Sequence, residues 1–243
     1  MTENEFLTLC EKSFAQNGIS EYNKDEILKK LYELSVIFAE ANAVMNLTAI
    51  KDEALVISRH FADCLIPAAL LPEGAKIIDI GSGGGMPALP IAIARPDLTV
   101  FALDATEKKT AYIESAAKKL GLSNVRVITG RAEELAHTPI RETFDVAIAR
   151  AVAELRILAE WCVPYIRPGG KFIALKGKRT SDELDAAQNA LKTLSCKLIA
   201  TDDKPLYDID GTVSERHALV FEKTAKTSPA YPRKNAQIQK KPL

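Results

Sequence analysis

Apolar positions in the first quarter of the chain follow a helical period. Between residues 24 and 45 they lie three or four positions apart, which predicts an amphipathic helix with one buried face. The residues on that face are Ile27, Leu31, Leu34, Phe38, Ala41 and Met45. Residues 52–66 are predicted to form a further helix, which leads into a turn at Pro72 and Gly74. We therefore expect a helical extension that packs on the main part of the protein.

From Lys76 onward, short apolar runs alternate with longer amphipathic stretches. We predict strands at residues 76–80, 99–104, 125–129, 144–149 and 171–176, and helices at residues 107–120, 154–166 and 181–194. Near-continuous apolar strands separated by helices indicate an α/β fold, a parallel sheet with helices on both faces. Two more strand-like segments, near residues 197–206 and 216–223, have a short connection and predict an antiparallel pair at one edge of the sheet.

These patterns divide the chain into three parts. Residues 1–70 are expected to form the helical extension, residues 71–223 the α/β domain and residues 224–243 a tail. The tail contains no acidic residue, although the formal net charge of the whole chain is +0. Its basic residues are Lys226, Arg233, Lys234, Lys240 and Lys241. Such a segment is either a solvated terminus or an arm that binds a polyanion, and charge alone does not decide between them.

Composition is that of an ordinary globular enzyme, with 47% hydrophobic and 26% charged residues among 243. No apolar stretch approaches the ~18 residues that span a bilayer. The acidic N-terminus lacks the basic start and long apolar run of a signal peptide, so we expect a cytoplasmic protein with no membrane partner. The cysteines, with no Cys-x-x-Cys, and three scattered histidines offer no zinc spacing, so no metal is expected. The cysteines are Cys10, Cys64, Cys162 and Cys196.

Four glycines fall within five positions of the sequence KIIDIGSGGGMPALPIA, between the first predicted strand and an apolar run that begins a helix. Ligands of open α/β sheets bind at such a turn, where bare N–H groups and a helix N-terminus can face them. The glycines, Gly83 among them, are therefore expected to let a ligand lie against the backbone. The dinucleotide fingerprint G-x-G-x-x-G is not matched, because Met86 stands at its last position.

Two carboxylates near this turn discriminate between ligands. Asp104 ends the second predicted strand, where an acid accepts both hydroxyls of an adenosine ribose, as both NAD and S-adenosylmethionine require. Asp79 lies just before the first glycine, where a carboxylate would repel a pyrophosphate but can hold the ammonium of a methionine moiety. The pattern therefore favours S-adenosylmethionine as cofactor. The alternative is a plain glycine turn with two solvated aspartates.

The residues that follow the later predicted strands limit the possible methylation reactions. The Asn/Asp-Pro-Pro-aromatic motif, common in methylation of exocyclic base amines, is absent after the fourth predicted strand. Cytosine C5 methylation needs a nucleophilic cysteine near that position, and Cys162 lies instead within a predicted helix. The reaction that remains is methyl transfer to an atom that already has a free lone pair.

Motifs spaced along the chain carry a resemblance to a known family. They are NLTAI (46–50), RHFADCL (59–65), DIGSGGGMPALPIAI (79–93), Arg131-Ala132-Glu133, ARAVA (149–153), LKG (175–177) and YPRK (231–234). In this order they resemble the bacterial 16S ribosomal RNA guanine-N7 methyltransferases, also called glucose-inhibited division protein B or methyltransferase G of the small subunit. Three departures are Cys64 in place of serine, Met86 in place of Phe, and a Lys-Asn-Ala tail in place of Lys-x-Gly.

The resemblance covers about residues 46–243 and has specific implications. It implies a class I S-adenosylmethionine-dependent methyltransferase, with a Rossmann-like, mostly parallel seven-stranded sheet and an N-terminal helical extension. The implied product is 7-methylguanosine in 16S ribosomal RNA near the decoding centre. The implied cofactor contacts are Gly81, Met86, Ala132, Glu133 and Arg150. Reasoning from the residues adds Asp79, Gly83 and Asp104.

Other polar residues are candidates for RNA contact. His60 and Asp63 lie three apart on one face of a helix, and we interpret them as a surface pair, with RNA contact as the alternative. The candidate phosphate contacts are Arg59, Lys176, Lys178, Arg179, Arg233 and Lys234. Taken singly, each of these is interpreted as a solvated charge, with phosphate contact as the alternative.

Guanine N7 bears an in-plane lone pair and no proton, so no general base is required and no catalytic residue is assigned. Alignment and exclusion of water would supply the rate, and a flanking carboxylate or carbonyl could stabilise the cationic purine. Because the N7 edge lies in the deep groove of A-form RNA, the target base must be unpaired or extruded. The expected partner is 16S ribosomal RNA or a small-subunit particle. The alternatives are a methyltransferase of another RNA, a small molecule or a protein, and a non-enzymatic dinucleotide sensor.

Overall fold

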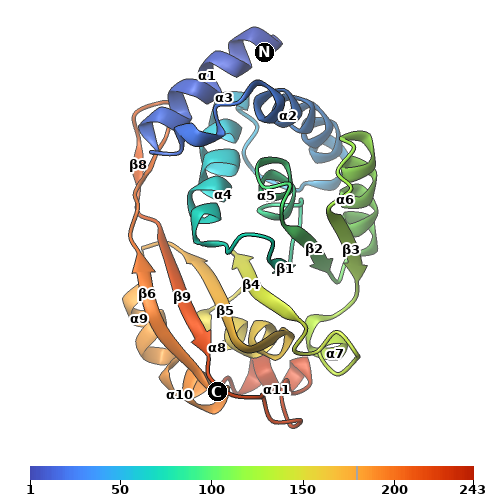
Figure 1. Ribbon diagram of the computed structural model, residues 1–243, viewed down its shortest axis with the longest axis vertical. Helices are drawn as coiled ribbons and strands as arrows, with labels where there is room; N and C mark the ends of the chain where they lie inside the picture. Colours follow the sequence, from blue (N-terminus) through green and yellow to red (C-terminus); the bar gives the residue numbers. More distant parts are fainter. Residues whose placement is uncertain (179) are drawn as a thin grey trace.

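The chain folds around a seven-stranded sheet with the order β3-β2-β1-β4-β5-β9-β6 (Figure 1). The computed structural model describes residues 1–178 and 180–243. The strands are β1 (Lys76–Ile80), β2 (Thr99–Asp104), β3 (Val125–Thr129), β4 (Phe144–Arg150), β5 (Ile166–Lys176), β6 (Cys196–Asp202) and β9 (His217–Lys223). Pairings among β1 to β5 are parallel, whereas β9 runs antiparallel to both β5 and β6. The predicted mostly parallel sheet with an antiparallel pair at one edge is confirmed.

Helices cover both faces of the sheet, because successive strand residues point to opposite sides. In β1, Ile77 packs in one apolar cluster and Ile78 in another, and both are fully buried. The helices on the Ile77 side are α1 (Glu3–Gln16), α2 (Asp25–Met45), α5 (Ala88–Ala94) and α6 (Glu107–Lys119). Those on the Ile78 side include α7 (Ala132–Leu135), α8 (Leu155–Cys162) and α10 (Gln188–Thr193), with α9 (Thr180–Ala186) before α10. In the part of the chain that the structure describes, no helix is long and apolar enough to cross a membrane.

One predicted boundary differs around β5. The strand begins at Ile166 rather than at residue 171, because Ile166 already pairs with Phe144 ahead of an irregularity in the β4–β5 register. The predicted helix at residues 154–166 is correspondingly shorter, ending at Cys162 before a 3₁₀ turn.

The N-terminal extension contains one helix that is not among those predicted above, α1. Its start is a capping box: Thr2 Oγ1 accepts from the Glu5 N–H, and the Glu5 carboxylate accepts from the Thr2 N–H. Its buried residues are Phe6, Cys10, Ser13 and Phe14. The predicted helix at residues 24–45 is confirmed as α2.

The predicted helix at residues 52–66 is helical but not regular. It consists of α3 (Glu53–Val56), a π-helical turn (Ile57–Ala62), α4 (Asp63–Leu65) and a 3₁₀ helix (Ile66–Leu70). Wide turns of this kind are rare and occur frequently at functional sites. The π-helical turn lies at the carboxyl end of β4, since Arg59 and His60 both contact Arg150 there.

A two-stranded ribbon, β7 (Leu206–Tyr207) and β8 (Val213–Ser214), follows β6 and precedes β9 along the chain, and it is not predicted from the sequence. Tyr207 exchanges two hydrogen bonds with the side chain of Asn17, at 3.0 and 2.9 Å. The connection between the last two strands of the sheet is thereby attached to the end of α1.

The tail lies against α8. Its helix α11 (Asn235–Lys240) buries Ile238, and Arg233 binds the Glu160 carboxylate through Nε and Nη2, at 2.9 and 2.7 Å. The Glu160 side chain is fully buried and that of Arg233 is 22% exposed. The interpretation of the tail as a solvated terminus is therefore wrong at Arg233, because a buried carboxylate holds its partner in place.

Replacing Arg233 with alanine should lower the free energy of unfolding by about 3–5 kcal/mol, because it leaves Glu160 buried and unpaired. Lys234→Ala, at the neighbouring exposed position, is the matched control and should change stability by less than about 0.5 kcal/mol. Urea unfolding followed by circular dichroism measures both. An Arg233→Ala protein as stable as the parent would show that this pair does not hold the tail.

Candidate functional site

The turn between β1 and α5, the glycine loop (residues 81–85), is held on the end of β2. Gly81, Gly83 and Gly85 have positive φ angles of 75°, 53° and 78°, which residues with side chains rarely adopt. The N–H of Gly81 donates to the carbonyl of Leu103 at 2.8 Å. The loop therefore makes a tight turn at the carboxyl edge of the sheet, where ligands of such folds bind.

The four glycines of the loop have different neighbours. A Cβ at Gly84 would lie 2.9 Å from the ring of Phe38 and 3.4 Å from Leu47 Cβ, and one at Gly85 would meet the following helix. At Gly83, by contrast, the nearest atom is a backbone oxygen 3.8 Å away. The expectation that all four glycines admit a ligand is therefore wrong. Gly81, Gly84 and Gly85 leave room for protein side chains, and only Gly83 of the four faces open space.

Asp104 supports this loop from the end of β2. Its Oδ2 accepts from the Gly83 N–H at 2.9 Å and its Oδ1 from the Thr106 N–H at 2.8 Å. An ionised carboxylate has about four acceptor positions, so one on each oxygen remains for another donor. Two neighbouring ribose hydroxyls would match that arrangement.

Asp79 is the most buried carboxylate of the site, at 1% exposure. Its Oδ2 accepts a 3.3 Å hydrogen bond from the Ala88 N–H, and its Oδ1 has no partner among the described residues. Burial raises the pKa of Asp79 to about 7, against the lowering effects of the Ala88 hydrogen bond and the Arg150 charge. A buried acceptor without a donor costs about 1–3 kcal/mol. An ammonium at this position would supply the donor and favour the ionised carboxylate.

The remaining candidate cofactor contacts follow β1 and β3. Met86 comes directly after the loop and is 7% exposed, and Ala132 and Glu133 open α7 with 9% and 7% exposure. The carbonyl of Ala132 accepts from the Tyr165 hydroxyl at 2.7 Å, which fixes the start of α7. A bare loop, an acceptor for a diol and an unpaired carboxylate together fit S-adenosylmethionine.

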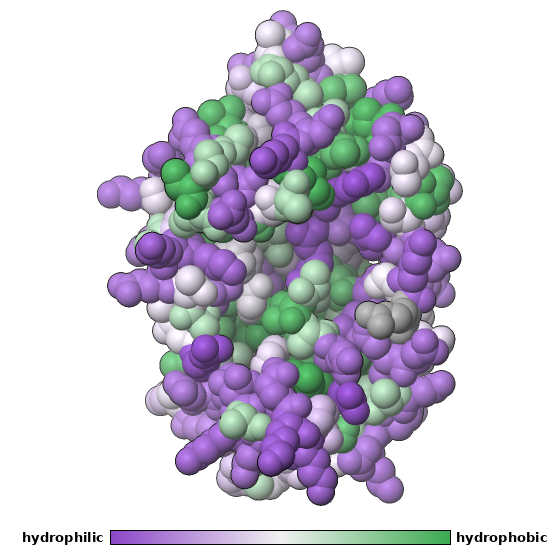
Figure 2. All heavy atoms as spheres, turned by 180° about the vertical axis from the view of Figure 1, so that it is seen from behind, coloured by the Kyte–Doolittle hydropathy of each residue, from purple (hydrophilic) through white to green (hydrophobic). Residues whose placement is uncertain are grey.

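A pocket of about 610 Å³ adjoins the glycine loop at the carboxyl ends of β4 and β5. Val152 belongs to both regions, because it lines the pocket and would contact a Cβ on Gly81 at 2.9 Å. Figure 2 shows a hollow across the middle of the molecule seen from behind, with hydrophobic side chains inside and hydrophilic ones around it. The charged residues of the pocket lining are Arg59, Asp63, Arg150, Glu154, Lys176, Glu183 and Arg216.

Arg150 is the centre of a buried polar cluster on the floor of this pocket. Its Nη1 donates to the Arg59 carbonyl (3.1 Å) and to Asp63 Oδ2 (2.8 Å), and its Nη2 donates to His60 Nδ1 (3.2 Å). Asp63 Oδ1 also accepts from Arg216 Nε at 2.6 Å. His60 is 9% exposed, as is the side chain of Asp63. The interpretation of His60 and Asp63 as a surface pair is therefore wrong, because both face a buried guanidinium.

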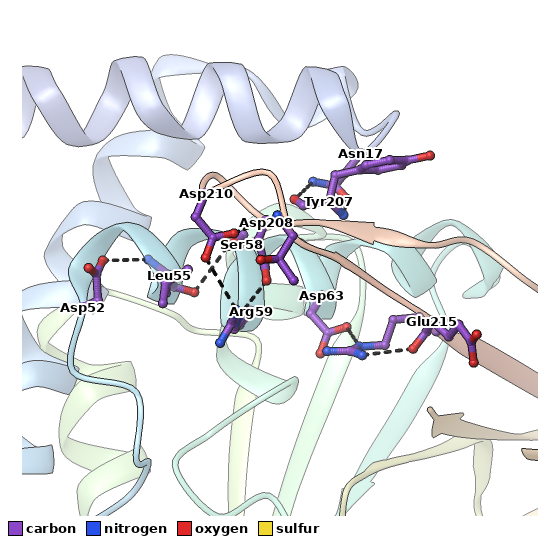
Figure 3. Close-up of polar contacts among 12 residues, drawn as sticks. Asn17, Asp52, Leu55, Ser58, Arg59, Asp63, Tyr207, Asp208, Asp210 and Glu215 are labelled. Carbon is purple, nitrogen blue, oxygen red and sulfur yellow. Dashed lines mark hydrogen bonds and ion pairs between the residues drawn. The ribbon is translucent and has the colours of Figure 1, made fainter. Parts of the chain in front are cut away.

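The candidate phosphate contacts separate into paired and exposed residues. Three have carboxylate partners: the pairs are Arg59–Asp208, Lys176–Glu183 and Arg233–Glu160, at 2.8, 2.6 and 2.7 Å. Figure 3 shows Arg59 pointing toward Asp208 and Asp210 of the β7–β8 connection. Lys178 and Lys234 are exposed. Arg179 lies outside the described residues.

The four cysteines are free and buried. Burial raises the pKa of Cys64 and of Cys196 to about 12, and it raises the pKa of the Cys162 thiol well above its ordinary value. Such thiols stay protonated near neutral pH and are poor nucleophiles. Within residues 1–178 and 180–243, no group of three or more His, Cys, Asp or Glu residues is arranged to hold a metal ion.

The sequence alone did not identify three residues of the site. Thr48 lies in the NLTAI motif and contacts His60 Nε2 through its Oγ1 at 3.1 Å. Arg216 joins the Arg150 cluster from just before β9, and Glu183 reaches the pocket from α9. Thr48 could have been found from the sequence, because it lies in the NLTAI motif that carries the family resemblance. Arg216 and Glu183 carry no local signal, since their partners are distant in the sequence.

Comparison with known proteins assigns a family. Residues 27–204 match the family described as rRNA small subunit methyltransferase G. The chain is 36% identical over 242 residues to Ribosomal RNA small subunit methyltransferase G of Clostridium perfringens (strain 13 / Type A), covering 98% of this chain and 99% of that protein. It is 39% identical over 210 residues to the protein of the same name from Brevibacillus brevis, covering 85% of this chain and 87% of that protein.

Solved structures show the same fold. The chain is similar to a SAM dependent methyltransferase from Aquifex aeolicus with a TM-score of 0.53, over 72% of this chain and 96% of that one. Their sequences are 16% identical, so this likeness concerns the fold. The expected class I methyltransferase fold with N-terminal helices is confirmed.

Asp104→Ala should weaken S-adenosylmethionine binding by about 1–3 kcal/mol, the scale of hydrogen bonds to a charged group. Gly83→Val should abolish binding, because it places a branched side chain in the open space of the loop. Gly74→Ala is the matched control, since Gly74 has a similar φ of 66° and open surroundings but lies before β1. Titration calorimetry measures all three. Normal binding by Asp104→Ala would remove this carboxylate from the site.

A plot of cofactor affinity against pH should be bell-shaped. Asp79 is protonated below its pKa of about 7, so its attraction for an ammonium is present above that pH and is lost as pH falls. Above about pH 8 the α-amino group of the cofactor loses its own proton. Calorimetry between pH 5.5 and about 9 follows both limbs. Asp79→Asn should remove the fall in affinity on the acid side. A parent protein whose affinity does not fall there would contradict the assignment of Asp79 to the ammonium of the cofactor.

Proposed function

The chain belongs to the rRNA small subunit methyltransferase G family, and we propose that it methylates N7 of one guanine in 16S ribosomal RNA with S-adenosylmethionine as methyl donor. The observation that carries the proposal is the family match over residues 27–204, because this span contains the glycine loop and most of the adjoining pocket. The choice of N7 and of a position near the decoding centre follows from the resemblance of the motifs, and a cytoplasmic location is in keeping with a ribosomal RNA substrate.

The residues around the glycine loop have distinct tasks in holding the methyl donor. Asp79 would bind its ammonium, Asp104 its ribose hydroxyls, and Ala132 and Glu133 lie where such folds meet an adenine. When bound, S-adenosylmethionine supplies an electrophilic methyl group, which N7 can accept with its lone pair without losing a proton. The open backbone at Gly83 admits the ligand to the carboxyl edge of the sheet.

Because no proton has to move, the protein needs to orient the base and to exclude water. Orientation of this kind can supply ~7–11 kcal/mol at its upper end. The methylated purine is cationic. Of the three carboxylates in the pocket lining, Asp63 is already paired with two arginines, and Glu154 and Glu183 are the ones that could stabilise the purine. Arg150 and its partners form a rigid floor against which the base can be held.

Access to N7 requires a base outside a duplex, since this edge lies in the deep groove of A-form RNA. A pocket of about 610 Å³ at the edge of the sheet suits one extruded base. We assign contact with the RNA backbone to the exposed lysines, Lys178 and Lys234 among them, in preference to Arg233, whose charge is paired with Glu160.

Two other functions make different demands on the site. A dinucleotide sensor would place a pyrophosphate beside Asp79, where a buried carboxylate opposes it. A small-molecule or protein methyltransferase would not require the exposed basic residues at Lys178 and in the tail. Calorimetry with NAD and with S-adenosylmethionine separates the sensor from the enzymes.

Mapping of 7-methylguanosine tests the proposal directly. Small subunits from cells that lack this gene should be missing one 7-methylguanosine in 16S RNA, and the purified protein with S-adenosylmethionine should restore it. Parallel reactions with free 16S RNA and with intact small subunits identify the substrate form. An unchanged set of modified guanines in the deleted strain would contradict the proposed function.

The cysteines should be dispensable for methyl transfer. Cys162→Ala should retain activity within a few fold after correction for stability, because its buried thiol is protonated and makes no covalent bond to a base. Rates are compared at equal concentrations of folded protein. Complete loss of transfer in a folded Cys162→Ala protein would indicate a covalent mechanism and reject N7 as the acceptor.

A further inference from the structure

His60 contacts three separate parts of the site. Its ring packs edge-on against Phe38 of α2, with the ring centroids 5.5 Å apart. Its Nδ1 faces Arg150 Nη2 at 3.2 Å, and its Nε2 faces Thr48 Oγ1 at 3.1 Å. The ring is 9% exposed, so both nitrogens are engaged inside the protein. This position leaves the side chain no free polar group for RNA.

The direction of both hydrogen bonds follows from chemistry. A guanidinium can only donate, so His60 Nδ1 accepts from Arg150 and the ring proton is on Nε2. Burial and the nearby charge of Arg150 lower the pKa of His60 to about 4, although Asp63 opposes this. The imidazole is therefore neutral near pH 7, and its Nε2–H donates to Thr48.

The segment that receives this hydrogen bond packs on the glycine loop. Thr48 Oγ1 also accepts from the Ile50 N–H at 3.1 Å, and the Thr48 N–H donates to Asn42 Oδ1 at 2.8 Å. Leu47, the preceding residue, lies where a Cβ on Gly84 would approach it to 3.4 Å. Residues 46–50 thus have a fixed shape, with one side against the loop and the other bonded to His60.

We propose that His60 is a positioning residue that joins the glycine loop to the floor of the base pocket. Its Nε2–H holds residues 46–50 against the loop, and its Nδ1 holds Arg150 at the end of β4. The loop that binds the cofactor and the arginine beneath the base are thereby parts of one hydrogen-bonded unit. The inference rests on the proposed function for the identity of the cofactor, and its test needs no RNA.

Two pairs of variants separate this role from simple packing. Glutamine at position 60 can place an N–H near the Nε2 position, whereas asparagine reaches only the Nδ1 position. His60→Gln should keep the bond to Thr48, and His60→Asn should lose it. From the other side, Thr48→Val removes the acceptor and Thr48→Ser retains it. Thr8→Val is the control, because the Thr8 hydroxyl is exposed and bonds within α1.

Binding of S-adenosylhomocysteine, measured by calorimetry, is the readout. His60→Asn and Thr48→Val should each weaken binding about three- to tenfold, the range of a single hydrogen bond. His60→Gln, Thr48→Ser and Thr8→Val should stay within about twofold. The double variant His60→Asn with Thr48→Val should bind no more weakly than Thr48→Val alone, since Thr48→Val already removes the bond to His60 together with the acceptor for the Ile50 N–H.

Thermal unfolding of each variant shows whether the binding protein is folded at the assay temperature. Equal losses in His60→Gln and His60→Asn, additive losses in the double variant, or unchanged binding by Thr48→Val would overturn the proposal. A lower unfolding temperature with unchanged affinity would also overturn it, because that is the signature of packing alone. A parent protein that binds S-adenosylhomocysteine but leaves 16S RNA unmodified would reject the proposed function and leave this test intact.

Discussion

A largely buried guanidinium has to be paired, and this requirement organises the carboxyl edge of the sheet. The side chain of Arg150 is 16% exposed at the end of β4. Its acceptors are the Arg59 carbonyl, His60 and Asp63, all from the π-helical turn and the start of α4. Breaking such a pair costs several kcal/mol. The helical extension is therefore fixed on the domain by the charge that also forms the floor of the base pocket.

The two aspartates at this edge of the sheet, Asp104 and Asp79, have opposite environments. Both oxygens of Asp104 receive backbone N–H groups, so this carboxylate shapes the glycine loop before any ligand arrives. Asp79 is more deeply buried and has one oxygen without a donor. One carboxylate is thus suited to neutral hydroxyls and the other to a cation. A cofactor with a ribose at one end and an ammonium at the other satisfies both requirements together.

The sheet could be predicted because near-continuous apolar strands are visible in a single sequence, and the glycine loop because its composition is unusual. Helix α1 could also have been predicted, because its buried residues Phe6, Cys10, Ser13 and Phe14 lie at helical spacing and a capping box opens it. The ion pairs could not be predicted. Asp63 lies 87 residues from Arg150, and Glu160 lies 73 residues from Arg233. Charged residues of the predicted helices, such as Asp63 and Glu160, are therefore buried against partners that only the tertiary structure supplies.

A crystal structure with S-adenosylhomocysteine tests the proposed cofactor site most directly, because it places the ribose, the amino group and the sulfur at once. Both ribose hydroxyls should lie within hydrogen-bond distance of the Asp104 carboxylate, and the amino group should lie beside Asp79 Oδ1. The ligand sulfur should lie on the side of the pocket whose floor is formed by Arg150. A ligand bound away from the glycine loop, or with its sulfur facing away from that pocket, would contradict the account.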